Sequence, residues 1–244
     1  NGIHIIDIKE TVKGLLLAKR FLAKTVAEGK DVCFVGTKRQ ARSVIEQRVG
    51  DVKMHWVTER WLGGTLTNFR TIRQRLKRLE ELEQIEQTDN FASYSKKMES
   101  QLRREKAKID RNLRGIRNMD KLPGALVVID VKREANALRE ARKLGIPTIC
   151  LIDTDGDPDM ADIPIPGNDD SMRSIDVVVR ELCLAIAEGK QQREAARDAA
   201  EGAAPADANG PRRSRRAQFR ADDTGPSDHG DESAPAQPVA AEQQ

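Results

Sequence analysis

The chain has 244 residues, of which 33% are charged and only 3% are aromatic, with a formal net charge of +3. This length allows one large domain or two small ones, whose core has to be aliphatic. No apolar run approaches the roughly 18 residues of a membrane helix, and the three cysteines lack CxxC spacing, which argues against a disulfide framework or a zinc site and favours buried thiols in a reducing compartment.

The first sixty residues predict alternating strands and helices. The expected elements are a strand at 3–6, a helix from Asp7 or Lys9 to about Glu28, a strand at 31–35, a helix at about 38–48 and a strand at 54–57. Because the chain starts at Asn1 without Met, inside strand-like sequence, we expect further residues before it.

The region 67–118 carries no strand signal and predicts two long helices instead. Their apolar residues at helical spacing are Ile72, Leu76, Leu79, Leu82 and Ile85, then Tyr94, Met98, Leu102, Ile109, Leu113 and Ile116. A turn at Thr88-Asp89-Asn90 makes the helices antiparallel, and the narrow apolar stripe is typical of a coiled-coil seam. From Leu66 to Asn118 there are 14 Lys and Arg against 8 Asp and Glu, a net of +6, so we expect a basic arm.

The alternation resumes after this arm. The expected elements are a strand at 125–129, a helix at about 133–143, a strand at 146–152, an Asp-rich loop at 153–162, an edge strand at 163–166 and a helix from Ser171 to about Glu188. Gly145 and Gly189 are expected to end the two helices. Continuous apolar strands between helices indicate the α/β class, with a doubly wound parallel sheet of flavodoxin-like or Rossmann-like type.

These elements give a domain plan in three parts. We predict an α/β domain of residues 1–66 and 119–192, an inserted antiparallel coiled-coil hairpin of residues 67–118, and a disordered C-terminal tail of residues 193–244. The tail is rich in Ala, Asp, Glu, Gly, Pro and Gln and has no apolar periodicity. Its basic cluster Arg212-Arg213-Ser214-Arg215-Arg216 is either an RNA contact or a solvated charge run.

The most enzyme-like signal is an apolar strand that ends in Asp153-Thr154-Asp155-Gly156-Asp157. A phosphohydrolase of the haloacid-dehalogenase type presents its nucleophile and acid in this way, but such enzymes need Thr or Val where Asp157 stands. A calcium loop is disfavoured because its twelfth position is Pro164 rather than Glu. We interpret the segment as a plain loop, with ion binding or catalysis by Asp153 and Asp155 as alternatives.

A second signal lies where a strand turns into a helix, at Gly36-Thr37-Lys38-Arg39-Gln40. A helix N-terminus beside Lys and Arg is suited to an anion, so the segment is either an RNA phosphate site or an ordinary helix start. Neither a P-loop nor a GxGxxG fingerprint is present, and His4, His55 and His229 are not spaced as metal ligands. We therefore expect no cofactor and no metal.

The third signal contains both tryptophans of the chain, in and just before the segment Arg60-Trp61-Leu62-Gly63-Gly64-Thr65-Leu66-Thr67-Asn68-Phe69. Thr67 or Asn68 is expected to cap the first helix of the arm, while Trp61 and Phe69 pack the arm onto the sheet domain. That arrangement leaves Arg60, Arg70 and Arg73 facing outward, where they are able to contact phosphates.

Four segments together carry a family resemblance. They are Gly2-Ile3-His4-Ile5-Ile6-Asp7, Phe34-Val35-Gly36-Thr37-Lys38, the Arg60 to Phe69 segment and Ile165-Pro166-Gly167-Asn168-Asp169-Asp170-Ser171. Over roughly residues 2–190 the chain resembles the bacterial-type family of small-subunit ribosomal protein S2. The family usually has a further N-terminal segment, and the tail beyond about Gly189 departs from its pattern.

The resemblance implies a non-enzymatic structural constituent of the small ribosomal subunit in the cytoplasm. Its implied partners are 16S rRNA and other small-subunit ribosomal proteins, including the large, multi-OB-fold protein that captures messenger RNA, with no membrane and no small-molecule substrate. Binding by shape and phosphate position is expected to use cations of the arm and strand ends. We predict RNA contacts by Lys38, Arg39, Arg42, Arg60, Arg70, Arg73, Arg75, Lys77, Arg103, Arg104, Arg111, Arg114 and Arg117.

Overall fold

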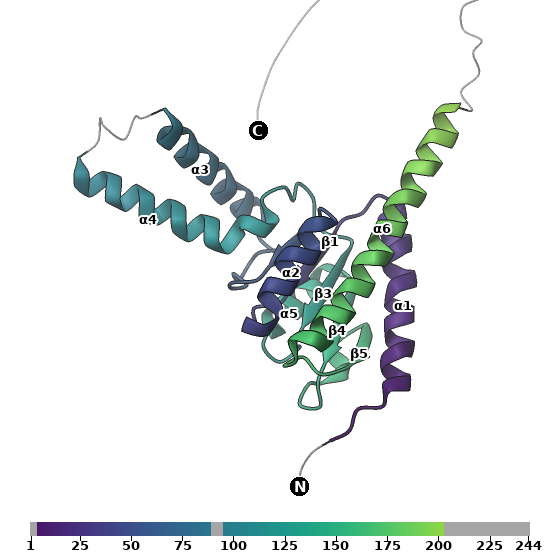
Figure 1. Ribbon diagram of the computed structural model, residues 1–244. Helices are drawn as coiled ribbons and strands as arrows, with labels where there is room; N and C mark the ends of the chain where they lie inside the picture. The colour runs from purple at the N-terminus through teal and green to yellow at the C-terminus, as the bar shows by residue number, and fades with distance from the viewer. Residues whose placement is uncertain (1–3, 89–94, 203–244) are drawn as a thin grey trace, which may run out of the picture. The chain divides into compact units, whose positions relative to one another are not determined.

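A computed structural model describes residues 4–88 and 95–202 of the chain (Figure 1). Five parallel strands form one sheet in the order β2-β1-β3-β4-β5. They are β1 (Val32–Val35), β2 (His55–Val57), β3 (Ala125–Ile129), β4 (Thr148–Ile152) and β5 (Ile163–Pro166). This is the flavodoxin-like order of a doubly wound sheet, so the predicted fold class is confirmed.

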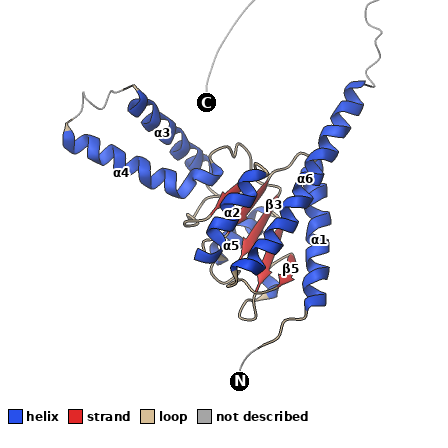
Figure 2. Ribbon diagram, viewed as in Figure 1, coloured by secondary structure: helices blue, strands red, loops and turns tan. Residues whose placement is uncertain are grey.

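Four helices cover the sheet, and Figure 2 shows the strands enclosed between them. They are α1 (Ile8–Ala27), α2 (Arg39–Asp51), α5 (Ala135–Leu144) and α6 (Met172–Gly202). Alternate strand residues face opposite sides: Phe34 packs in the cluster with α1, α2 and α6, while Cys33 packs with α5 and the root of the arm. The aliphatic core predicted from composition therefore divides into two layers.

The hairpin arm consists of α3 (Phe69–Gln87) and α4 (Lys96–Leu113), followed by the 3-10 turn η2 (Arg114–Ile116). The predicted seam is confirmed in its inner part, where the buried residues are Ile72, Leu76, Leu79, Leu82, Leu102, Ile109, Leu113 and Ile116. Met98 is 44% exposed, so the seam is weaker toward the tip. The stretch between Leu102 and Ile109 is bridged by ion pairs, since Lys106 contacts Glu86 across the helices. Tyr94 and the expected turn at Asp89-Asn90 lie outside the described residues.

The strand predicted at 3–6 is wrong for the part that the structure describes. Residues 4–7 form no strand, and Ile5 is 93% exposed. A strand needs a pairing neighbour, but the edge strand β5 is flanked by α1: the Thr11 hydroxyl donates to the carbonyl of Pro166 at 2.6 Å. Asp7 instead caps α1, its side chain accepting a hydrogen bond from the backbone N–H of Lys9 at 2.8 Å.

The predicted end of the last helix at Gly189 is also wrong, because α6 continues to Gly202. Gly189 is a crossing point rather than a stop: a Cβ added there would lie 2.6 Å from the carbonyl oxygen of Ala23 in α1. A glycine allows two helices to approach this closely, and helix packing outweighs its low helix propensity. Residues 193–202 of the expected tail are therefore helical, and 203–244 lie outside the described residues.

No helix in the described ranges is long and apolar enough to cross a membrane.

Candidate nucleic-acid interface

Lys38 is enclosed by carboxylates at the carboxyl edge of the sheet. Its Nζ lies 2.7 Å from Asp169, 2.7 Å from Asp170 and 3.3 Å from Asp130, and its side chain is 16% exposed. Burial by itself lowers the pKa of Lys38, but hydrogen bonds to Asp169 and Asp170 and the charge of Asp130 raise that pKa above its ordinary value. Lys38 is thus a permanently charged counter-ion for carboxylates of its own chain.

The start of α2 also faces an internal anion. The backbone N–H of Thr37 donates to Glu134 at 3.0 Å, and the Thr37 hydroxyl donates to the same carboxylate oxygen at 2.5 Å. Glu134 is only 3% exposed, and burial raises the pKa of its carboxyl in spite of these hydrogen bonds. The sequence left this helix start open between an RNA phosphate site and an ordinary helix start; in the structure it binds a carboxylate of its own chain.

The two carboxylates of the enzyme-like signal have different neighbours in the structure. Asp153 lies beside Asp169 and Asp170, with one oxygen of each within 4.8 Å of the others, whereas Asp155 is exposed and lies 3.4 Å from Lys132. Three such carboxylates are able to ligate a cation, but the ammonium of Lys38 already contacts two of them. The geometry resembles an internal salt-bridge network more than a nucleophile beside its acid.

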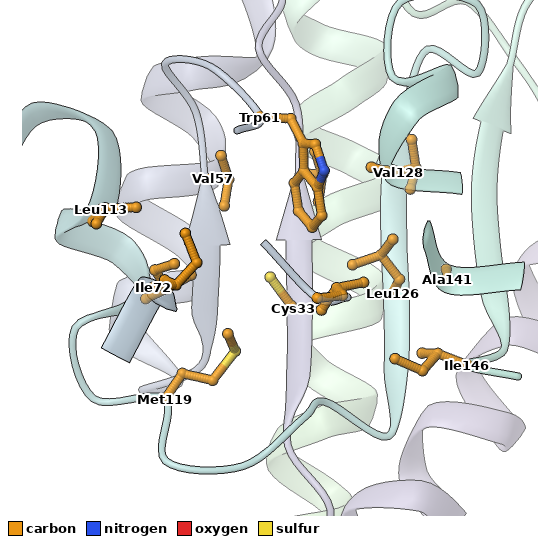
Figure 3. Close-up of a cluster of buried hydrophobic side chains, with 14 of the residues drawn as sticks. Cys33, Val57, Trp61, Ile72, Leu113, Met119, Leu126, Val128, Ala141 and Ile146 are labelled. Carbon is orange, nitrogen blue, oxygen red and sulfur yellow. The ribbon is translucent and has the colours of Figure 1, made fainter. Parts of the chain in front are cut away.

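The tryptophan-glycine motif packs the arm onto the sheet domain. Trp61 is buried, and Figure 3 shows its indole among Val57, Leu126 and Val128. The indole N–H donates to Glu140 of α5 at 3.0 Å, and the same carboxylate accepts backbone hydrogen bonds from the motif. Asn68 occupies the expected N-cap position of α3, but its side chain makes no capping hydrogen bond. The Thr67 hydroxyl donates to Glu140 instead, so neither side chain caps the helix.

Six of the thirteen predicted RNA-contacting residues have acceptors within the protein. Besides Lys38, they are Arg42 with Glu59 at 2.9 Å, Arg73 with Asp120 at 2.7 Å, Arg103 with Glu99 at 2.8 Å, Arg111 with Glu59 at 3.9 Å and Arg117 with Glu83 at 2.5 Å. Each pair competes with RNA phosphate for the cation. The Arg111 contact is the weakest, because its atoms are furthest apart and its side chain is 67% exposed.

The other seven predicted residues are exposed and form no ion pair with any residue in the described ranges. They are Arg39, Arg60, Arg70, Arg75, Lys77, Arg104 and Arg114. Arg70 and Lys77 lie seven residues apart on one face of α3, but Gln74, Glu81 and Gln84 share that face, so its charge is mixed. All thirteen residues remain predictions as RNA contacts.

The outer face of α4 has a different composition. We use this term for seven positions on the side of α4 away from the seam: Lys97, Ser100, Gln101, Arg104, Ala107, Lys108 and Arg111. Four of these side chains are cationic and none is acidic. The three acidic residues of α4 lie off this face. Glu99 pairs with Arg103, Glu105 lies 3.7 Å from Arg78 of α3, and Asp110 is half-buried at the edge of the face.

Two cations of this face, Lys97 and Lys108, were not among the residues predicted from the sequence. Both are exposed, and neither pairs with another side chain in the part of the chain that the structure describes. Their spacing from Arg104, seven and four residues, was the available signal. Glu140 had no comparable signal, since more than seventy residues separate it from the motif that it contacts.

Comparison with known proteins identifies the family. A family model described as ribosomal protein S2 matches residues 1–189. The chain belongs to the ribosomal protein S2 family. It is 52% identical over 192 residues to small ribosomal subunit protein uS2 of Rhodopirellula baltica, a match that covers 79% of this chain and 74% of the relative. It is also 48% identical over 198 residues to uS2 of Acidothermus cellulolyticus, covering 81% and 72%.

Membership of the S2 family confirms the resemblance carried by the Arg60 to Phe69 segment. The S2 family is a structural component rather than an enzyme family, so the alternative of a phosphohydrolase using Asp153 and Asp155 is not supported. Within this family, the functional question is which cations of the chain face RNA.

Proposed function

We propose that the protein is a structural constituent of the small ribosomal subunit that binds 16S rRNA through exposed cations without internal partners. The observation that carries the proposal is the outer face of α4, which has no carboxylate and four cations. Among the described residues, Arg111 alone of these four has an internal contact, the 3.9 Å approach to Glu59. A carboxylate near a cation both neutralises it and repels phosphate, so an acid-free face has the strongest attraction for an RNA backbone.

The spacing of this face suits a polyanion. Lys97, Arg104 and Arg111 follow one another at intervals of seven residues, or about 10.5 Å along the helix axis. A row of cations of this length is able to contact several phosphates of one RNA helix. Recognition would then follow backbone shape rather than base sequence, as is usual for double-stranded RNA.

The test compares two variants with equal net charge. The outer-face variant carries Lys97→Gln, Arg104→Gln and Lys108→Gln, and the control carries Lys9→Gln, Arg20→Gln and Lys24→Gln on α1. All six side chains are exposed, and each variant lowers the net charge from +3 to 0. Glutamine is well tolerated in helices, so both variants are expected to fold.

Affinity for 16S rRNA is measured over a range of KCl concentrations. We expect the outer-face variant to reduce the slope of log affinity against log salt by about two to three, because each phosphate contact contributes roughly 0.7 to 0.9. The control should change this slope by less than about one. Equal losses in the two variants would mean that only net charge matters, and would refute the proposal.

We also propose that the protein supports docking of the large, multi-OB-fold ribosomal protein that captures messenger RNA. Family membership supports this partner. Small subunits depleted of the S2-family protein should bind the OB-fold protein poorly and recover binding when the chain is added back. Full binding by the depleted subunits would contradict the proposal.

A further inference from the structure

Glu140 binds the root of the arm through both of its carboxylate oxygens. Oε1 accepts from the indole N–H of Trp61 at 3.0 Å and from the backbone N–H of Gly64 at 2.8 Å. Oε2 accepts from the backbone N–H of Leu66 at 3.0 Å and from the N–H and hydroxyl of Thr67 at 3.1 and 3.2 Å. One side chain of α5 thus accepts five hydrogen bonds from the segment that leads into α3.

The backbone conformation of this segment explains the convergence. Gly64 has a φ of +89°, which a residue with a Cβ rarely adopts, and the chain then turns so that Asn68 N–H donates to the Gly64 carbonyl at 2.8 Å. Successive backbone N–H groups in such a turn form a concave anion-binding nest. Here the nest binds the carboxylate of Glu140, so these N–H groups are not available to an RNA phosphate.

The electrostatics of Glu140 agree with a tightly held anion. Burial by itself raises the pKa of Glu140, but the hydrogen bonds from Thr67, Trp61, Gly64 and Leu66 outweigh burial and lower that pKa below its usual range. Hydrogen bonds to a charged acceptor are stronger and more directional than those between neutral groups. The buried side chains of Trp61 and Leu66 also hold the root, but apolar packing alone fixes direction less strictly.

We propose that Glu140 is a positioning residue that fixes the direction of the arm relative to the sheet and thereby presents the outer face of α4 to RNA. The consequence for RNA binding rests on the function proposed above, whereas the effect on arm direction does not. The proposal predicts an effect opposite to the usual one. Removing a negative charge from an RNA-binding protein ordinarily strengthens binding, but removing this one should weaken it.

Glu140→Gln is the informative substitution because it conserves the shape and removes the charge. An amide offers one acceptor oxygen and an NH₂ group, so the N–H donors that face its nitrogen lose their acceptor. The matched control is Glu80→Gln, since Glu80 is exposed on α3 and pairs with no residue in the described ranges. Both variants remove one negative charge from the chain.

Arm direction is measured without RNA, by the distance distribution between spin labels on Ser43→Cys in α2 and Gln101→Cys in α4. Both positions are exposed, whereas Cys33, Cys150 and Cys183 are buried and should not be labelled. We expect one narrow distribution for the parent chain and for Glu80→Gln, and a broadened or shifted one for Glu140→Gln. An unchanged distribution in Glu140→Gln would overturn the proposal.

Affinity for 16S rRNA is measured on the parent chain, Glu140→Gln and Glu80→Gln without the cysteine substitutions, because Gln101 lies on the outer face of α4. Glu140→Gln should bind about three- to tenfold more weakly, and Glu80→Gln as tightly as the parent chain or slightly more tightly. Tighter binding by Glu140→Gln would also overturn the proposal. So would loss of cooperative urea unfolding, because Glu140 would then support the entire fold rather than the root. If the outer-face variant binds RNA normally, the proposed function fails, but the label distances still test Glu140.

Discussion

The carboxyl edge of the sheet and the outer face of α4 are both basic in sequence, but they differ in what surrounds their cations. At the sheet edge, Lys38 lies among Asp130, Asp169 and Asp170. On the outer face of α4, Arg104 forms no ion pair with any of the described residues. A charged residue inside a network stabilises the fold, and a charged residue without a partner is available to a ligand. Counting Lys and Arg along a sequence does not separate these roles.

The largest expected effect comes from the internal side of this comparison. Lys38→Met keeps much of the side-chain volume but leaves the buried carboxylate of Asp169 and the half-buried carboxylate of Asp130 without their counter-ion. Breaking a buried ion pair in this way typically costs about 3 to 5 kcal/mol, so we expect a lower free energy of unfolding by about 3 kcal/mol in urea titrations. Arg39→Met, at an exposed residue without a partner, should change this free energy by less than about 0.5 kcal/mol. Similar losses of unfolding free energy in both variants would contradict the distinction between cations with and without internal partners.

The sequence predicted the order and class of most elements because their signals are local. Apolar runs and helical periodicity identified all five strands of the sheet and the inner seam of the arm. The error at the end of the last helix arose because glycine has two structural roles. Gly189 has the signature of a helix end, but it permits a close helix crossing that depends on Ala23, a residue far away in the sequence.

The candidate interface was less predictable than the fold. The basic character of the arm follows from composition, and the outer face of α4 follows from helical spacing once the seam is known. Which cations have internal partners depends on side chains that meet only after folding, as Arg42 and Glu59 do. Glu140 could not be found from the sequence, because a glutamate on a helix surface is ordinary until a distant loop surrounds it with N–H donors.

A second prediction sharpens the internal side of the comparison through pH. The pKa of Glu140 is lowered in the folded protein, so its contribution to stability is complete above the ordinary value of 4.5 and is lost as pH falls through the folded-state pKa. The pKa of Glu134 is raised, so folding stability decreases as pH rises from 4.5 through the folded-state pKa. The buried Glu134 and the half-buried Glu140 therefore act in opposite directions.

These opposite signs are measurable by urea unfolding at a series of pH values between 3 and 7. The stability difference between the parent chain and Glu140→Gln should shrink as pH falls below about 4.5. As pH falls, the free energy of unfolding of the parent chain should instead increase relative to that of Glu134→Gln. Parallel stability curves for all three proteins would show that neither carboxyl is coupled to folding in this range.

The smallest expected effect separates two adjacent arginines of the arm. Arg103 pairs with Glu99 at 2.8 Å, whereas Arg104 lies on the outer face of α4 without a pairing partner among the described residues. The substitutions Arg103→Gln and Arg104→Gln remove the same charge from neighbouring positions of one helix. If partnering decides availability, Arg104→Gln should lower the salt slope of 16S rRNA binding by about 0.7 to 0.9, and Arg103→Gln by clearly less. The two variants have the same net charge, and the substituted positions are adjacent in the helix. An equal change in the salt slope would therefore mean that distance to the RNA, rather than the internal ion pair, selects the contacting residue.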